Sequence, residues 1–352
     1  MTASKGIKHN SVMDIDSRVS YLRTGQQTCH NEKGQIIDCS GTGQDAEFRY
    51  GIPSPTPRFE IKGELVEDRL TGLSWTRKTN FAEFPLSWQE ALDFVLQMNH
   101  QQQYGFSDWR LPNRQELHSL LSYQSCKPAL PTDHPFKQVF QGWYWTSTTA
   151  AINPAYAWYI HMEGARMFYG GKDQSYLVWP VRAEGNGILP ATGQRYCYDT
   201  EGNSVECAGT GQDGEHQFGY PWPQPRFTRR DDSVEDHLSG LIWYCNANLT
   251  GAPVGWSSAL SIVDELNRQD KMRHWRLPNI NEFESLVDCV YSKPALSRPQ
   301  LFDNVQDFYW SSSTSMYEPD WAWVLYLDKG AVGVGQKHLP NFFVWPVCCQ
   351  DN

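Results

Sequence analysis

The chain has 352 residues, which at roughly 150 residues per domain suggests two domains and leaves ample sequence for a buried core. Hydrophobic residues make up 40%, charged residues 20% and aromatic residues 14%, a composition that excludes disordered, collagen-like and coiled-coil proteins. The net charge is −10, which disfavours binding to nucleic acid or to an anionic membrane surface. No apolar run of about 18 residues occurs and the segment from Met1 to Asp16 has no signal-peptide pattern, so we expect no membrane insertion.

The two halves of the chain are copies of each other. The segments Thr24–Cys29 and Cys39–Asp45 recur 168 residues later, and Trp109-Arg-Leu-Pro-Asn113 recurs as Trp275-Arg-Leu-Pro-Asn279. Such a repeat predicts two units of the same fold. We place an N-terminal segment at residues 1–20, the first domain at 21–183, a linker at 184–191 and the second domain at 192–350.

Each copy combines helices and strands in the same order. A polar segment between two cysteines predicts a β-hairpin, and a Pro-rich, exposed stretch follows it. Two helices come next, because Ser87 with Glu90 and Asn113 with Glu116 have the spacing of capping boxes. Short aromatic and β-branched runs after residue 140 predict a small twisted antiparallel sheet. The expected fold class is therefore α+β.

Nine cysteines are present, and none of their spacings forms a CxxC zinc or redox pair. Each hairpin is expected to be closed across its mouth by a disulfide, Cys29 with Cys39 and Cys197 with Cys207. Disulfides favour a location outside the cytoplasm, whether secreted, periplasmic or at the cell surface. The later cysteines allow further bridges that join Cys348 or Cys349 to Cys245 and Cys289, and Cys126 remains unmatched. The sequence leaves the pairing of these five residues open.

Several motifs occur in the same order in both copies: Trp-Arg-Leu-Pro-Asn-x-x-Glu, then Tyr-Trp-Ser/Thr-Ser, then Val-Trp-Pro-Val. With these motifs the sequence resembles the Lcl C-terminal domain family, in two tandem copies. The resemblance implies a C-type-lectin-like fold, with two helices flanking small twisted sheets and a long loop region that carries binding. It also implies surface adhesion, although the acidic charge of this chain argues against the sulfated polysaccharide that the family's named member binds.

The loops after the two hairpins carry paired carboxylates, which are oxygen ligands that a hard cation such as Ca²⁺ uses. The four residues are Asp45, Glu47, Asp213 and Glu215. Two carboxylates per loop fall short of the six or more oxygens that Ca²⁺ prefers. The alternative is a turn in which the aspartate caps backbone N–H groups or pairs with Arg58 or Arg226. The sequence favours the turn and leaves a metal as the other interpretation.

Aromatic residues divide into two groups. Tryptophans that recur in both copies are expected in the core, whereas aromatics that differ between the copies are candidates for stacking on the apolar face of a sugar. The candidates are Trp143, Tyr156, Tyr159, Tyr169, Tyr176, Tyr317, Trp321 and Tyr326. Ordinary half-buried strand positions are the alternative for each.

No motif of a serine hydrolase, a zinc protease or a nucleotide-binding loop occurs, so we expect no enzyme activity. The sequence predicts a non-catalytic protein that binds a surface polysaccharide or a partner protein through its lectin-like loops. One alternative is a structural subunit that self-assembles into a homo-oligomer or surface filament. Another is an oxidase of the formylglycine-generating type, which needs a reduced, accessible Cys348 or Cys349.

Overall fold

The computed structural model describes residues 21–270 and 272–349. The expected N-terminal segment, residues 1–20, therefore lies outside the described residues. The first copy begins with a two-stranded hairpin and a short helix, and continues with a four-stranded sheet, two helices and a three-stranded sheet. Its elements are β1 (Cys29–His30), β2 (Ile36–Ile37), α1 (Asp45–Phe48), β3 (Phe59–Lys62), β4 (Leu65–Asp68), β5 (Ser74–Thr76), α2 (Trp88–His100), η1 (Gln103–Gly105), α3 (Arg114–His118), β6 (Trp143–Thr149), β7 (Tyr156–His161), β8 (Met167–Gly171) and β9 (Val181–Arg182).

The second copy repeats this order almost element for element. Its elements are β10 (Cys197–Tyr198), β11 (Ser204–Val205), α4 (Asp213–His216), β12 (Phe227–Arg230), β13 (Ser233–Asp236), β14 (Leu241–Tyr244), α5 (Trp256–Gln269), α6 (Ile280–Leu286), β15 (Phe308–Thr314), β16 (Trp321–Tyr326), β17 (Ala331–Gln336) and β18 (Val347–Cys349). Helices and small antiparallel sheets occur in both copies, so the expected α+β class is confirmed.

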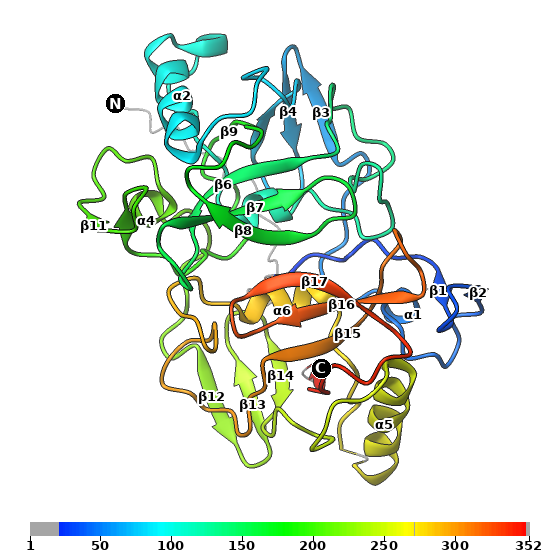
Figure 1. The fold of residues 1–352 in the computed structure, drawn as a ribbon. Helices are drawn as coiled ribbons and strands as arrows, with labels where there is room; N and C mark the ends of the chain where they lie inside the picture. The colour runs from blue at the N-terminus through cyan, green and yellow to red at the C-terminus, as the bar shows by residue number, and fades with distance from the viewer. Residues whose placement is uncertain (1–20, 271, 350–352) are drawn as a thin grey trace, which may run out of the picture.

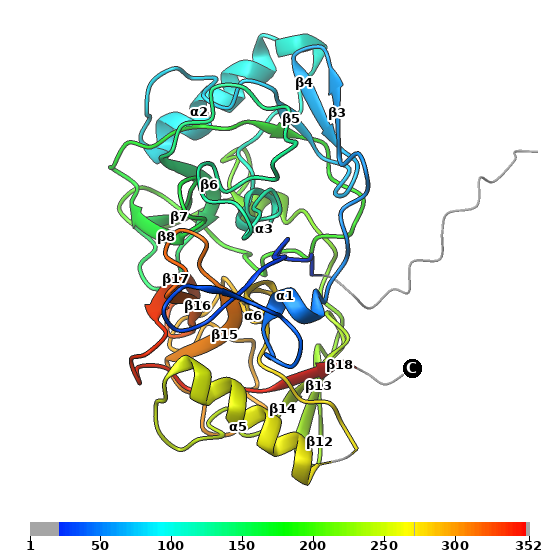
Figure 2. The same cartoon turned by 90° about the vertical axis from the view of Figure 1, so that its right-hand side faces the viewer.

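The predicted small sheets of the two copies join into one. The strand order is β15-β16-β17-β8-β7-β6, and Val332 of β17 pairs with Met167 of β8 across the junction. Figures 1 and 2 show this six-stranded sheet running through both halves, with α3 and α6 behind it. Sequence patterns predict strands within each copy, whereas pairing between the copies depends on how their edges meet.

Each disulfide-closed hairpin packs against the opposite copy. In Figure 1, β1, β2 and α1 lie beside the strands of the second copy, and β11 and α4 lie beside those of the first. The hairpin tips are glycines with positive φ, +75° at Gly34 and +88° at Gly202. A Cβ on Gly34 would lie 3.0 Å from the backbone nitrogen of Asp320, and one on Gly202 would lie 2.8 Å from that of Ala155. Each tip therefore needs glycine both for its turn and for its close approach to the other copy.

The helix and core predictions are confirmed. Ser87 with Glu90, Asn113 with Glu116 and Asn279 with Glu282 form complete capping boxes at the starts of α2, α3 and α6. Each cap satisfies backbone N–H groups that have no partner within the helix. The repeated tryptophans are at most 2% exposed and fill the core: Trp75, Trp109, Trp145, Trp158, Trp179, Trp243, Trp275, Trp310, Trp323 and Trp345.

The two hairpin disulfides form as expected, Cys29 with Cys39 and Cys197 with Cys207. The expected bridges of Cys245 and Cys289 to the C-terminal cysteines are wrong, because Cys245, Cys289 and Cys349 carry thiols. Cys245 and Cys289 lie in one hydrophobic cluster of the second copy, and Cys348 lies in another. Cys349 packs against the same cluster as Cys245 and Cys289, so the difference in cluster separates only Cys348 from them. Among the described residues, no helix has the length and apolar character needed to cross a membrane.

Candidate functional site

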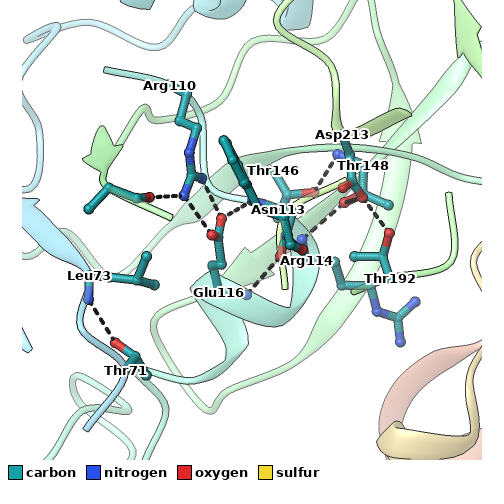
Figure 3. A network of polar contacts seen from close by, with 12 residues as sticks. Thr71, Leu73, Arg110, Asn113, Arg114, Glu116, Thr146, Thr148, Thr192 and Asp213 are labelled. Atoms are coloured by element: carbon teal, nitrogen blue, oxygen red, sulfur yellow. Dashed lines mark hydrogen bonds and ion pairs between the residues drawn. The ribbon is translucent and has the colours of Figure 1, made fainter. Parts of the chain in front are cut away.

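The Trp-Arg-Leu-Pro-Asn-x-x-Glu motif forms a buried polar network. Arg110 donates two hydrogen bonds to Glu116, and the Glu116 carboxylate also accepts from the backbone N–H of Asn113. Asn113 donates to the carbonyl of Phe218, whose ring lies 4.5 Å from the Arg110 guanidinium. Figure 3 shows Arg110 and Glu116 facing each other beside the start of α3. The motif therefore caps α3 and holds a segment of the second copy.

The second copy makes the same arrangement in the opposite direction. Arg276 pairs with Glu282, Asn279 donates to the carbonyl of Tyr50, and the Tyr50 ring lies 4.1 Å from the Arg276 guanidinium. In each copy the motif thus binds the segment that follows the hairpin of the other copy. We call this hairpin and the segment after it the exchanged segment. Buried charge pairs of this kind are satisfied only when both partners are present.

Asp45 and Asp213 are buried in this exchanged contact. Asp213 accepts hydrogen bonds at 2.6 Å from Thr148 of β6 and from Thr192 (Figure 3). Asp45 accepts in the same way from Ser313 at 2.6 Å and from Thr24 at 2.7 Å. Burial raises the pKa of both aspartates to about 6, although the hydroxyl donors oppose the rise.

The glutamates of the same loops have a different role. Glu47 accepts from the backbone N–H groups of Gly41 and Gly43, and Glu215 accepts from those of Gly209 and Gly211. Each glutamate thus closes its own glycine loop, whereas the aspartate two residues earlier accepts from one hydroxyl of the other copy and one of its own. In the part of the chain that the structure describes, no three His, Cys, Asp or Glu side chains are grouped to hold a metal ion.

Arg58 and Arg226, the expected partners of these aspartates, bind other carboxylates. Arg58 pairs with Asp68 and Arg226 pairs with Asp236. The turn interpretation is therefore wrong about the partner of each aspartate, because Asp45 and Asp213 turn inward to serine and threonine. The sequence predicted that the aspartates would cap backbone N–H groups of the loops, but Glu47 and Glu215 accept those hydrogen bonds instead.

The predicted stacking residues fall into separate places. Trp143, Tyr159 and Tyr176 form one cluster. The Tyr159 ring centroid lies 4.4 Å from that of Trp143 and 4.7 Å from that of Tyr176, but Tyr159 is only 8% exposed. Tyr326 packs with Phe308 and Phe342 in the second copy, at 5.7 Å and 6.1 Å. The exposed Tyr317 lies against Lys127, and Trp321 is half-buried at the start of β16.

Three rings at the junction of the half-sheets form an aromatic row, which consists of Tyr156, Tyr169 and Phe168. Tyr156 and Tyr169 have centroids 6.0 Å apart and planes inclined by 23°, and Tyr169 and Phe168 lie 5.2 Å apart with planes inclined by 18°. Tyr156 is 36% exposed, and the other two rings are half-buried. Nearly parallel rings that are partly exposed are an arrangement on which a flat apolar surface of a ligand can stack.

Polar groups from the second copy stand beside this row. The Lys329 ammonium lies 5.8 Å from the centroid of Phe168 and 5.0 Å from that of Tyr326. The neighbouring Asp328 has a buried Oδ1 atom without a hydrogen-bond partner, and burial raises the pKa of this carboxyl. The charge of Asp328 acts with burial to raise the pKa of Tyr169. Aromatic faces next to hydrogen-bonding groups are typical of ligand sites.

A buried contact fixes the row and these polar groups relative to each other. The Trp158 ring packs edge-on against Tyr169 at 5.3 Å, and the Arg114 guanidinium lies 4.0 Å from the Trp158 ring. Arg114 donates to Glu284 of the second copy and to the carbonyl of Gly330, in the turn that carries Asp328 and Lys329. Because Arg114 is fully buried, this connection holds the two parts of the candidate site rigidly.

A family model, the Lcl C-terminal domain, matches residues 64–182 and again residues 232–348. The two segments together span more than half of the chain. The chain belongs to the Lcl C-terminal domain family. No curated protein gives a significant match to the chain.

The aromatic row comes from the first Lcl domain, and Asp328, Lys329 and Tyr326 come from the second. The exchanged hairpins with Asp45 and Asp213 lie outside both matched segments. Comparison of the copies indicated Tyr156, Tyr169 and Tyr326 as candidates because the equivalent residues of the other copy differ, namely Trp321, Val334 and His161. Nothing in the sequence indicated Asp328 and Lys329, which reach the row only through the pairing of β17 with β8.

Proposed function

We propose that the protein is a secreted or surface-displayed, non-catalytic ligand-binding protein whose ligand is a surface polysaccharide. The observation that carries this proposal is the partly exposed aromatic row beside Lys329 and the unpartnered Oδ1 of Asp328. The rings suit the apolar face of a sugar, and the two polar groups suit its hydroxyls. A partner protein is the alternative ligand.

Fold and compartment support the proposal. Two helices that flank small twisted sheets agree with a C-type-lectin-like fold for each Lcl domain, and such folds carry many binding functions. The two hairpin disulfides suit an oxidising compartment outside the cytoplasm. Cys349 carries a thiol and is half-buried, so an oxidase of the formylglycine-generating type stays an alternative that thiol titration of the native protein tests.

Self-assembly into a filament through strand addition at the six-stranded sheet has less support. The outer edge of β6 is covered by the backbone of Leu177, and that of β15 is covered by Phe343. A covered edge offers no free row of N–H and C=O groups to a second molecule.

A glycan-array screen with purified protein, with calcium and again with chelator, tests the proposal. For a glycan that binds, we expect Tyr169→Ala to weaken affinity about tenfold, since it removes a stacking ring worth roughly 1.4 kcal/mol. Calorimetric titration measures the change. Asp328→Asn should weaken binding as well, by loss of a charged acceptor.

Tyr196→Ala is the matched control, because Tyr196 is an exposed tyrosine, 55% accessible, that is not part of the row. Equal affinity of the Tyr169 variant, the Tyr196 variant and the native protein would contradict the assignment of the site. If no glycan on the array bound, the polysaccharide proposal would fail and a partner protein would be the ligand to test. Binding lost with chelator would show that a metal participates.

A further inference from the structure

In the Pro-rich segment the first copy has Ser54 where the second copy has Trp222. The Trp222 indole lies 4.3 Å from the Arg226 guanidinium, and its Nε1 atom donates to the Ala191 carbonyl at 2.8 Å. A Cβ placed on Gly193 would lie 3.0 Å from the same ring. The second copy therefore holds an indole between an arginine, a glycine and a backbone carbonyl.

The first copy has equivalents of the groups that surround this indole, but a cavity lies where the indole would be. Arg58 is fixed as Arg226 is, by an aspartate and a backbone carbonyl, here those of Asp68 and Ser119. Arg23, Gly25 and Arg58 stand at the positions of Ala191, Gly193 and Arg226, and all three line a cavity of about 310 Å³. That volume lies at the lower end of the range for small-ligand pockets, about 300–1,000 Å³.

The cavity presents hydrogen-bonding groups that the described chain leaves unused. No described residue donates to the Arg23 carbonyl, the counterpart of the carbonyl that accepts from Trp222. Asn281 is 9% exposed, lines the cavity, and has a buried Oδ1 atom without a partner. Figure 2 faces the side on which the chain from residue 21 passes between the two halves, in front of α3 and α6. An unsatisfied buried acceptor is costly, and a ligand N–H group would satisfy it.

We propose that this cavity binds a planar heteroaromatic ring with an N–H group, of the indole class, stacked on the Arg58 guanidinium. The bound ring takes the place that Trp222 fills in the second copy and donates to the Arg23 carbonyl or to Asn281 Oδ1. Stacking on a guanidinium and removal of the ring from water supply the affinity, and the N–H group supplies the specificity. This site is separate from the aromatic row, so its failure would leave the polysaccharide proposal untouched.

Binding of indole and of N-acetyl-tryptophanamide to the full chain, measured by calorimetry and by ligand-observed NMR, tests the proposal. We expect saturable binding with one site per chain. 1-Methylindole lacks the N–H group and should bind about tenfold more weakly, the effect of one lost hydrogen bond in a desolvated site. Binding of indole alone would identify a free small molecule as the ligand, and binding of both probes would allow a tryptophan side chain of a partner.

Two reciprocal variants locate the site. Ser54→Trp gives the first copy the residue of the second and should abolish binding, whereas Ser54→Ala, its matched control, should leave binding unchanged. Trp222→Ser opens the corresponding place in the second copy and should raise the stoichiometry from one to two. The Trp222 variant keeps the proposal testable if Ser54→Trp fails to fold. Absence of saturable binding to the native chain, or binding that survives Ser54→Trp, would overturn the proposal.

Discussion

At the scale of the residue, burial places ionisable groups where the two copies meet. Lys172 and Lys337 donate to backbone carbonyls of the opposite hairpin, and their ammonium groups lie about 4 Å from the rings of Trp88 and Trp256. Burial lowers the pKa of both lysines to about 7. Together with Asp45 and Asp213, whose pKa values are raised, these lysines make the exchanged contact sensitive to pH.

The pH dependence of Asp213 has a definite sign. Its folded pKa of about 6 exceeds the ordinary value of 3.8, so between these values the folded chain keeps a proton that the unfolded chain has lost. Its contribution to stability is therefore complete below pH 3.8 and is lost as the pH rises through 6. Asp213→Asn changes the free energy of unfolding at each pH. We expect this change to be more stabilising at pH 8 than at pH 4 by roughly 2–3 kcal/mol.

Urea unfolding at the two pH values measures this difference. Glu206→Gln is the control, since Glu206 is exposed on the same hairpin and should give the same small change at both. A loss of stability for Asp213→Asn that is equal at pH 4 and pH 8 would count against a raised pKa.

At the scale of the element, the hairpins are too short to be stable alone. β10 and β11 contain two residues each, and Cys197 and Cys207 close the loop between them over a sequence separation of 10. Two-stranded hairpins are marginal in water, so covalent closure and docking on the other copy must fix this one.

We expect the double variant Cys197→Ser, Cys207→Ser to lower the free energy of unfolding by about 2–3 kcal/mol, because the unfolded loop gains conformational freedom. Denaturant unfolding under non-reducing conditions measures the loss. Cys126→Ser, which removes a thiol outside both hairpins, should change the midpoint little. Equal midpoints for the double variant and the native chain would mean that docking alone holds the hairpin.

At the scale of the whole molecule, the exchange makes each copy depend on the other. Residues that receive the second hairpin, such as Thr148 and Lys172, have equivalents in Ser313 and Lys337 that receive the first. A single copy therefore carries both a hairpin and a surface to which a hairpin of the same type can dock.

A fragment of residues 21–188 should form a dimer that exchanges hairpins between two molecules, since the isolated copy cannot cover its own docking surface. Light scattering after size-exclusion chromatography, over a range of concentrations, measures its mass. The full chain serves as the control and is expected to remain a monomer of 40.4 kDa. A stable monomeric fragment would show that the exchange is dispensable.

The sequence by itself determined the repeat, the helix starts at Ser87 and Asn113, the hairpin disulfides and the buried tryptophans. These features depend on local spacing or on recurrence between the copies, which can be read along the chain. Only the tertiary structure decided which copy each hairpin covers, the joining of β8 with β17, and the approach of Lys329 to Phe168. Those contacts join residues of different copies, and their geometry depends on how two folded surfaces fit together rather than on any local pattern.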